Sequence, residues 1–191
     1  MNNDFKTIIS KLADDIFPMS VAFRRTLHQN PELSEKEFET TNFIEQTLIE
    51  NGITNIKKFS DTGLVAYDGS NYKNVVAIRA DIDALPLEEQ TELTYKSKNK
   101  GVMHACGHDA HTAILLATAI IINKIKNKHD GTFMYIFQPS EETFPGGAIT
   151  MINNGIFNDI KPKAILALHV MPNMESGTIG IKDGPYMAAT D

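Results

Sequence analysis

From residue 53 onward, short apolar runs of β character alternate with stretches of helical periodicity, and this alternation limits the chain to a few architectures. Strands are predicted at residues 53–59, 63–67, 75–79, 132–137, 164–169 and 178–182. Helices are predicted at residues 109–126 and, shorter, at 147–154. Strands that alternate with helices are typical of a parallel sheet covered by helices. The predicted fold class is therefore α/β, a three-layer sandwich with a largely parallel central sheet.

Residues 1–50 are predicted to be helical and to serve packing rather than chemistry. Pro18 is expected to separate a short amphipathic segment from a second one at residues 21–28. Ser34 and Glu37 have the spacing of a capping box, in which the Ser34 hydroxyl accepts from the Glu37 amide and the Glu37 side chain reaches back. The helix that follows is expected to end at Gly52.

The bulk composition fits one soluble domain. The chain has 191 residues and a formal net charge of -6. It has no block of like charge, so a nucleic-acid partner is not expected. Its first residues lack the layout of a secretory signal, and its longest nearly apolar stretch, residues 113–122, is shorter than the ~20 residues that span a bilayer. We expect a cytoplasmic protein without a membrane partner, and a surface excursion at residues 88–100.

Metal-capable side chains gather in four short tracts, three of which directly follow a predicted strand. The tracts are residues 104–111, Glu141-Glu142, His169, and Asp81 with Asp83. Because the carboxyl ends of parallel strands converge on one crevice, these distant residues are expected to meet there. A thiol, imidazoles and carboxylates in one cleft indicate a metallohydrolase.

The first of these tracts has the strongest metal signature. It holds Cys106, the one cysteine of the chain, and three of the six histidines. Cys106 and His108 lie on one turn where a helix begins, and the helix end is expected to lower the pKa of the thiol. Thiolate with imidazole favours zinc, cobalt or nickel over calcium and magnesium. His111, on the same helix face as His108, is expected to support a ligand rather than to be one.

The other tracts fit roles around such a metal. Of Glu141 and Glu142, one is expected to hold metal and the other to face the attacking water as general base. His169, at the end of a strand, is placed as a ligand. Asp81 and Asp83 are expected to bind metal or to orient a ligand imidazole.

Each tract also has an ordinary structural explanation. A lone cysteine is often a small buried hydrophobe, a Glu-Glu pair often serves solubility, and the two aspartates can simply begin a loop with Arg79 paired to one of them. A Cys-His nucleophile also stays open, although it leaves the glutamate pair without a role. The sequence contains no Gly-x-Ser-x-Gly elbow, dinucleotide fingerprint, phosphate loop or His-Glu-x-x-His helix.

Taken together, the tracts resemble those of the M20 metallopeptidase clan, and most closely its amidohydrolase branch. That branch includes N-acyl-amino-acid amidohydrolases, hippurate hydrolases and auxin-conjugate hydrolases. The resemblance runs from about Arg24 to the last residue. It rests on five tracts in the family's order, residues 25–33, 79–86, 103–112, 138–142 and 169–172.

The resemblance implies metal-dependent hydrolysis of the amide bond of N-acyl amino acids or similar small amide conjugates. It implies a pair of divalent ions (manganese, zinc, cobalt or nickel) with these ligands: Cys106, His108, Glu142 and His169. Cys106 is implied to bridge the two ions, and Glu141 to be the base that activates the water. Residues 81–86 stand where peptidase relatives carry a His-x-Asp-x-x-Pro motif, so Asp83 is implied as a supporting carboxylate.

The resemblance also implies a longer protein. Members of this family are about twice as long, with an inserted lid domain and a return to the catalytic domain that carries one more histidine ligand. Residues 1–191 are therefore expected to form the N-terminal part of a zinc-exopeptidase-like catalytic domain, incomplete by itself. A homodimer is expected for the full-length family. Two alternatives stay open: a dipeptidase or exopeptidase of the same clan, and a catalytically inactive fragment, for example a binding module.

Overall fold

A computed structural model describes residues 3–184. The helices are α1 (Asn3–Gln29), α2 (Phe38–Glu50), α3 (His108–Lys124) and α4 (Gly147–Asn153), with a 3-10 turn, η1 (Lys126–Lys128). The strands are β1 (Asn55–Lys57), β2 (Leu64–Asp68), β3 (Val75–Asp81), β4 (Thr132–Gln138) and β5 (Ala164–Ala167). Within the described residues, none of the helices combines the length and apolar character needed to cross a bilayer.

The strands form one mixed sheet in the order β1-β2-β4-β3-β5. Strands β3, β4 and β5 are parallel, while β1 pairs with β2, and β2 with β4, in antiparallel register. The α/β class is confirmed, and the parallel part is the half of the sheet that carries the predicted tracts. β1 and β2 are antiparallel because a short connection joins them, which permits a hairpin but no crossover.

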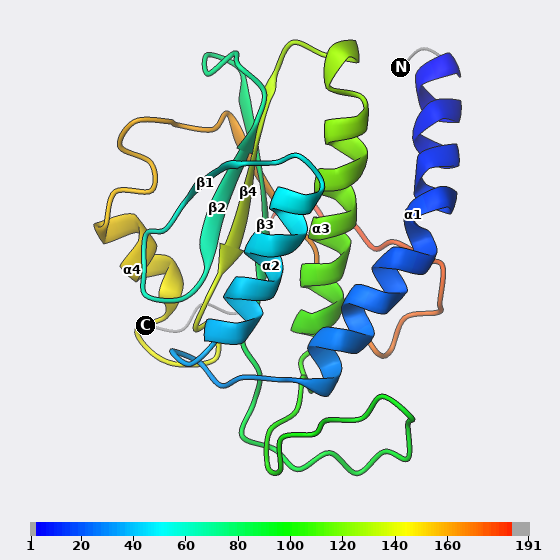
Figure 1. Cartoon of the computed structure of the whole chain (residues 1–191), viewed down its shortest axis with the longest axis vertical. Helices are drawn as coiled ribbons and strands as arrows, with labels where there is room; N and C mark the ends of the chain where they lie inside the picture. The colour runs from blue at the N-terminus through cyan, green and yellow to red at the C-terminus, as the bar shows by residue number, and fades with distance from the viewer. Residues whose placement is uncertain (1–2, 185–191) are drawn as a thin grey trace.

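Helices cover both faces of the sheet and make the predicted three layers (Figure 1). On one face, α2 and α3 pack through Ile44, Leu48 and Leu116 against Leu64 and Phe137. On the other, Met151 of α4 packs in a second cluster with the alternate strand residues, which include Val65, Tyr67, Met134 and Ile136. Side chains alternate across a strand, so β2, β3 and β4 each supply both cores.

Helix α1 runs unbroken through Pro18, which corrects the expected separation at that residue. Proline removes one helical hydrogen bond but permits a continuing helix where packing on both sides holds it. Ile16 on one side of Pro18 is buried against α3, and Phe23 on the other packs against the same cluster. Phe17 beside the proline is 67% exposed, so the disrupted turn faces water.

The capping box predicted for Ser34 and Glu37 is also wrong. Glu37 occupies the cap position of α2 but makes no capping hydrogen bond with its side chain, and the Ser34 hydroxyl instead donates to Asp83 at 2.7 Å. The carboxylate of Glu32 takes the capping role, because it accepts the backbone N–H of Thr40 at 2.7 Å. Gly52 ends the helix as predicted, with φ +82.

The strand predicted at residues 178–182 does not form. Its two isoleucines, Ile179 and Ile181, are 90% and 93% exposed, and no strand among residues 3–184 pairs with this segment. An alternating sequence becomes a strand only where a neighbouring strand can complete its hydrogen-bond ladder. Here β5 is the last strand on that side of the sheet.

Candidate metal centre

The carboxyl ends of the parallel strands bring the predicted tracts to the first turn of α3. Asp81 at the end of β3 pairs with Gln138 at the end of β4, and His169 follows shortly after β5. His108 is the first residue of α3. Residues that are far apart in sequence therefore surround one helix end, as the strand-end argument predicts.

A left-handed glycine shapes the turn between Cys106 and His108. Gly107 has φ +88, a conformation that residues with a Cβ rarely adopt. A Cβ at this position would lie 2.3 Å from Cγ2 of Val170, the neighbour of His169. The glycine therefore allows the segment after β5 to approach the Cys-Gly-His turn closely.

His108 is buried, and its two ring nitrogens have different surroundings. Nδ1 lies 2.9 Å from the carbonyl oxygen and 3.2 Å from Oδ1 of Asp83. Both atoms can only accept, so Nδ1 carries hydrogen. Nε2 is buried and has no hydrogen-bond partner. Burial lowers the pKa of His108, but the hydrogen bond to Asp83 and the nearby carboxylate charges outweigh it and raise the pKa.

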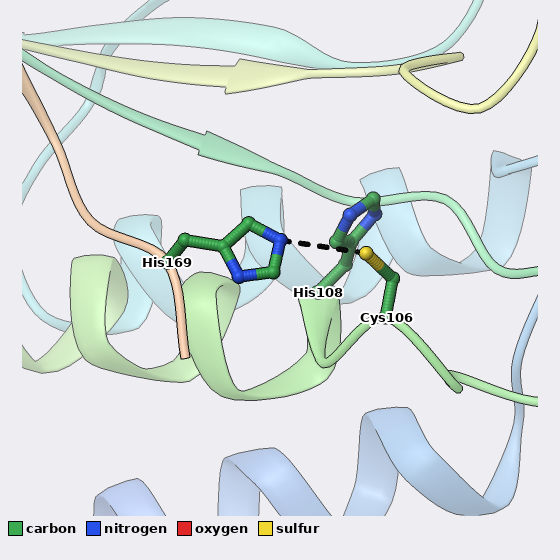
Figure 2. A group of neighbouring side chains, drawn as sticks. All are labelled: Cys106, His108 and His169. Carbon is green, nitrogen blue, oxygen red and sulfur yellow. Dashed lines mark hydrogen bonds between the residues drawn. The ribbon is translucent and has the colours of Figure 1, made fainter. Parts of the chain in front are cut away.

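His169 presents a second imidazole to the same place (Figure 2). Its Nδ1 lies 2.7 Å from the carbonyl oxygen of Val170, so this nitrogen carries hydrogen and Nε2 has the lone pair. Nε2 lies 3.4 Å from the sulfur of Cys106. In both His108 and His169 a carbonyl therefore holds Nδ1, and Nε2 is the nitrogen directed at the other site residues.

The two glutamates approach His108 from the segment after β4. His108 Nε2 lies 3.9 Å from Oε2 of Glu141 and 3.7 Å from Oε1 of Glu142. The Oε1 atom of Glu142 is buried without a hydrogen-bond partner. The side chain of Glu141 is 42% exposed, against 22% for Glu142. The solubility explanation does not fit this pair, because both carboxylates face a buried imidazole.

The two aspartates have separate tasks. Asp83 orients His108 and also accepts the backbone N–H of Glu142 at 2.9 Å. Asp81 pairs with Arg79 at 2.7 Å and with Nδ1 of His111 at 2.6 Å. These partners lower the pKa of Asp81 to about 2, although burial acts to raise it. Asp81, which Arg79 neutralises, also lies 3.6 Å from Nε2 of His108, whereas Asp83 contacts Nδ1 of the same ring.

His111 uses both of its nitrogens within the protein. Nδ1 lies 2.6 Å from Oδ1 of Asp81 and Nε2 accepts the backbone N–H of Val170 at 3.0 Å. An imidazole with both nitrogens engaged has no lone pair left for a metal. The position of His111 agrees with the expectation that it supports the site, since it ties the end of β3 to the segment that carries His169.

The expectation that the start of α3 lowers the pKa of Cys106 is wrong. Burial raises the pKa of the thiol to about 12, and the neighbouring carboxylates, Glu142 first, act in the same direction. Full negative charges outweigh the partial positive charge of a helix end. A divalent cation among these groups would reverse this balance, because a coordinating thiol loses its proton. The surroundings of Cys106 therefore suit a cation-bound thiolate better than an isolated nucleophile.

The donor atoms fit a cation site in number and kind. Three groups of ligand atoms, each within 4.8 Å of one another, share one residue: Cys106 with His108 and His169, Asp81 with His108 and His111, and His108 with Glu141 and Glu142. In the group of Asp81, His108 and His111, both nitrogens of His111 already have partners within the protein. The other two contain all four predicted ligands, joined through His108.

Comparison with known proteins agrees with this site. A model of Peptidase family M20/M25/M40 matches residues 77–186, which include every tract around His108. The chain belongs to this family.

Relatives in the M20 family align with nearly the whole chain. It is 42% identical over 187 residues to the N-acyl-L-amino acid amidohydrolase of Geobacillus stearothermophilus, an alignment that covers 97% of this chain and 50% of that protein. It is 46% identical over 172 residues to the N-acetyl-L-cysteine deacetylase of Bacillus subtilis, with 90% and 41% covered. The chain thus spans about half the length of the curated relatives that it matches.

A solved M20 structure shares the fold. The YXEP protein of Bacillus subtilis, described as a dinuclear metal binding peptidase from the M20 family, superposes with a TM-score of 0.79 at 42% identity. The superposition covers 94% of this chain and 48% of that one. The mixed five-stranded sheet is therefore part of an M20 catalytic domain fold.

Sequence reasoning missed that α1 reaches this M20 site. Arg24 and His28 both contact Oδ2 of Asp109, the residue after His108, at 2.8 Å. The second nitrogen of His28 lies 3.2 Å from Glu89, in the excursion at residues 88–100. The available signal was the spacing of four between Arg24 and His28, which puts both on one helix face.

A pocket of about 550 Å³ opens beside the metal-capable residues. Its lining includes Cys106 and His169 as well as His28 and Glu89. The lining also includes large apolar side chains: Leu93, Met103, Val170, Met171 and Pro172. A small organic molecule can therefore contact the pocket and the donor atoms at once.

Proposed function

We propose that the whole protein hydrolyses the amide bond of N-acyl amino acids or similar small amide conjugates with the help of two divalent metal ions. One observation carries this proposal: the buried, unpartnered Nε2 of His108 faces two glutamates beside a thiol and a second imidazole. Membership of the M20 family and the names of its relatives supply the reaction class.

Four side chains are proposed as metal ligands: Cys106, His108, Glu142 and His169. Their mixture of sulfur, nitrogen and oxygen donors favours manganese, zinc, cobalt or nickel. When bound, such ions supply the Lewis acidity that amide hydrolysis requires at neutral pH. By the family resemblance, a further histidine ligand belongs to the whole protein's site.

Glu141 is proposed as the general base. Its carboxylate is the more exposed of the pair and lies 3.9 Å from Nε2 of His108, so water can reach it beside a proposed ligand. It takes a proton from the attacking water and returns it to the leaving amine. Asp83 is proposed to support the reaction by holding His108 with Nε2 toward the site. The apolar side of the pocket would receive the acyl group of the substrate.

Turnover of the whole protein tests this function. The protein is loaded with manganese, zinc or cobalt and incubated with N-acetyl and N-benzoyl amino acids, and the released amine is measured. Glu141→Gln is expected to keep its metal content and lose turnover by roughly 10²–10⁴-fold, the usual contribution of a general base. Unchanged turnover in Glu141→Gln would end the assignment of the base.

A peptidase activity is the second candidate, because the solved relative is described as a peptidase. Dipeptides in the same assay separate the two, since the chemistry is shared and only the group that enters the pocket differs. Metal uptake without turnover of any of these substrates would favour a binding role instead.

A further inference from the structure

Glu37 is a fully buried carboxylate that no step of the proposed reaction uses. It stands just before α2, is 0% exposed, and its side chain makes no hydrogen bond that caps the helix. Instead its Oε1 accepts the backbone N–H of Ser140 at 2.7 Å, and its Oε2 accepts the hydroxyl of Thr62 at 2.7 Å. Burying a carboxylate is unfavourable unless it is hydrogen-bonded, so these contacts explain why it stays there.

The backbone of Ser140, to which Glu37 is hydrogen-bonded, has an unusual conformation. Within the described range, 3–184, Glu35 and Ser140 are the non-glycine residues with positive φ, at 65 and 52. They touch each other, because the backbone N–H of Glu35 donates to the Ser140 hydroxyl at 2.9 Å. A residue with a Cβ keeps this conformation only where its surroundings hold it. Here residues 35–37 hold Ser140 through both its backbone and its side chain.

The left-handed conformation of Ser140 sets the direction of the two side chains that follow it. Glu141 and Glu142 follow Ser140 directly, and both approach Nε2 of His108, at 3.9 and 3.7 Å. The same N-terminal segment also holds Asp83, because Ser34 donates to the Asp83 oxygen that accepts the N–H of Glu142. The loop before α2 therefore contacts both supports of the glutamate pair.

We propose that Glu37 is a positioning residue, which holds Ser140 in its left-handed turn and thereby aims Glu141 and Glu142 at the metal site. This inference rests on the proposed function, because the proposed function assigns Glu141 as the base and Glu142 as a metal ligand. A purely structural role, in which Glu37 only supports α2, makes a different prediction and can be separated from it.

The chain offers a matched control for that separation. Glu32 also accepts backbone N–H groups at the start of α2, from Glu39 at 3.2 Å and Thr40 at 2.7 Å. Glu32→Ala therefore weakens the same helix end without touching Ser140. Glu37→Gln keeps an acceptor oxygen for the Ser140 amide, whereas Glu37→Ala removes it. Glu37→Asp keeps the carboxylate but draws it back by one methylene, and serves as a milder variant should Glu37→Ala not fold.

Two measurements on the whole protein test the proposal. Amide hydrogen exchange of residues 138–147 without added metal reports on the turn itself, and calorimetric titration with manganese or cobalt reports on the ligands. Glu37→Ala and Glu37→Asp are expected to exchange faster in this segment and to bind metal roughly 10–100-fold more weakly, as for other supporting residues of metal ligands. Glu37→Gln is expected to resemble the parent. Glu32→Ala is expected to change exchange only in α2.

Failure of the positioning role can be distinguished from failure of the proposed function. Parent-like exchange and affinity in both Glu37→Ala and Glu37→Asp would overturn the positioning role. An equal loss in Glu32→Ala would overturn it too, in favour of simple support of α2. If the whole parent protein binds neither metal, the proposed function fails at this site, and with it the purpose assigned to Glu37, whatever the exchange shows.

Discussion

His108 and Glu142 face each other through two buried atoms, Nε2 and Oε1, that lie 3.7 Å apart and form no hydrogen bond. Each unpaired buried polar atom costs about 1–3 kcal/mol, so two that face each other need an explanation. A cation that both atoms coordinate provides one, and the thiol and second imidazole nearby provide further donors.

His108→Ala is expected to abolish tight metal binding, because His108 belongs to every group of donor atoms at the site. In the parent, a metal at about 100 times its dissociation constant stabilises the fold by about 2.7 kcal/mol, and this gain should vanish in the variant. Thermal unfolding with and without manganese or zinc measures it. His129→Ala is the control, since His129 packs on Phe133 away from these residues. An undiminished metal response in His108→Ala would contradict the site.

Asp83→Ala is expected to weaken metal binding by roughly 10–100-fold although Asp83 is not a proposed ligand. Its removal leaves Nδ1 of His108 with the backbone carbonyl of residue 83 alone, and it leaves Ser34 and the Glu142 amide without an acceptor. Each donor left unsatisfied costs about 1–3 kcal/mol of stability. Calorimetric titration and urea unfolding measure the two effects. Asp68→Ala, another buried aspartate, should leave metal affinity at the parent value, and a similar loss there would point to general destabilisation.

Gly107→Ala is expected to impair the site more than its backbone strain explains. Gly107 and Gly177 have nearly equal φ, +88 and +86, but only at Gly107 would a Cβ meet a neighbour, Val170, at 2.3 Å. Both alanine variants should lose about 1 kcal/mol from the left-handed conformation. Only Gly107→Ala should also displace the segment that carries His169 and reduce metal affinity. Equal metal affinities in the two variants would show that this close approach does not matter.

The contribution of His28 to stability is expected to fall as pH rises. Hydrogen bonds to Asp109 and Glu89 raise the pKa of His28 in the folded protein, although burial opposes them. A raised folded pKa means that the folded state holds the proton more tightly. The stabilisation is therefore complete below the unfolded pKa of about 6.5 and is lost as pH rises through the folded pKa.

A series of urea unfolding curves checks this dependence. The difference in unfolding free energy between the parent and His28→Gln should be largest near pH 6 and should shrink toward pH 9. The groups that face the ring are Asp109, Glu89 and the ring of Tyr95. Both carboxylates stay ionised across this range because their pKa values are lowered. A difference that stays constant with pH would rule out a charged His28 in the fold.

Much of the architecture could be predicted from short stretches of sequence. The β-type runs at residues 75–79 and 132–137 became β3 and β4, and the run of helical periodicity after Asp109 became α3. Periodicity and turn residues act over a few positions, so they predict an element without knowledge of the segments that pack against it. Where an element depends on a distant partner, the prediction failed, as in the strand expected at residues 178–182, which no described strand accompanies.

The sequence by itself determined the fold class, the tracts that gather at the strand ends, and the residue types that suit a metal. Only the tertiary structure decided which nitrogen of each histidine faces the site, that Arg79 neutralises Asp81, and that Glu37 holds Ser140 across 103 positions of chain. The physical reason is that a hydrogen bond needs its two atoms within about 3 Å at a suitable angle. Local sequence records which atoms can donate or accept, and the folded chain alone brings them within that distance.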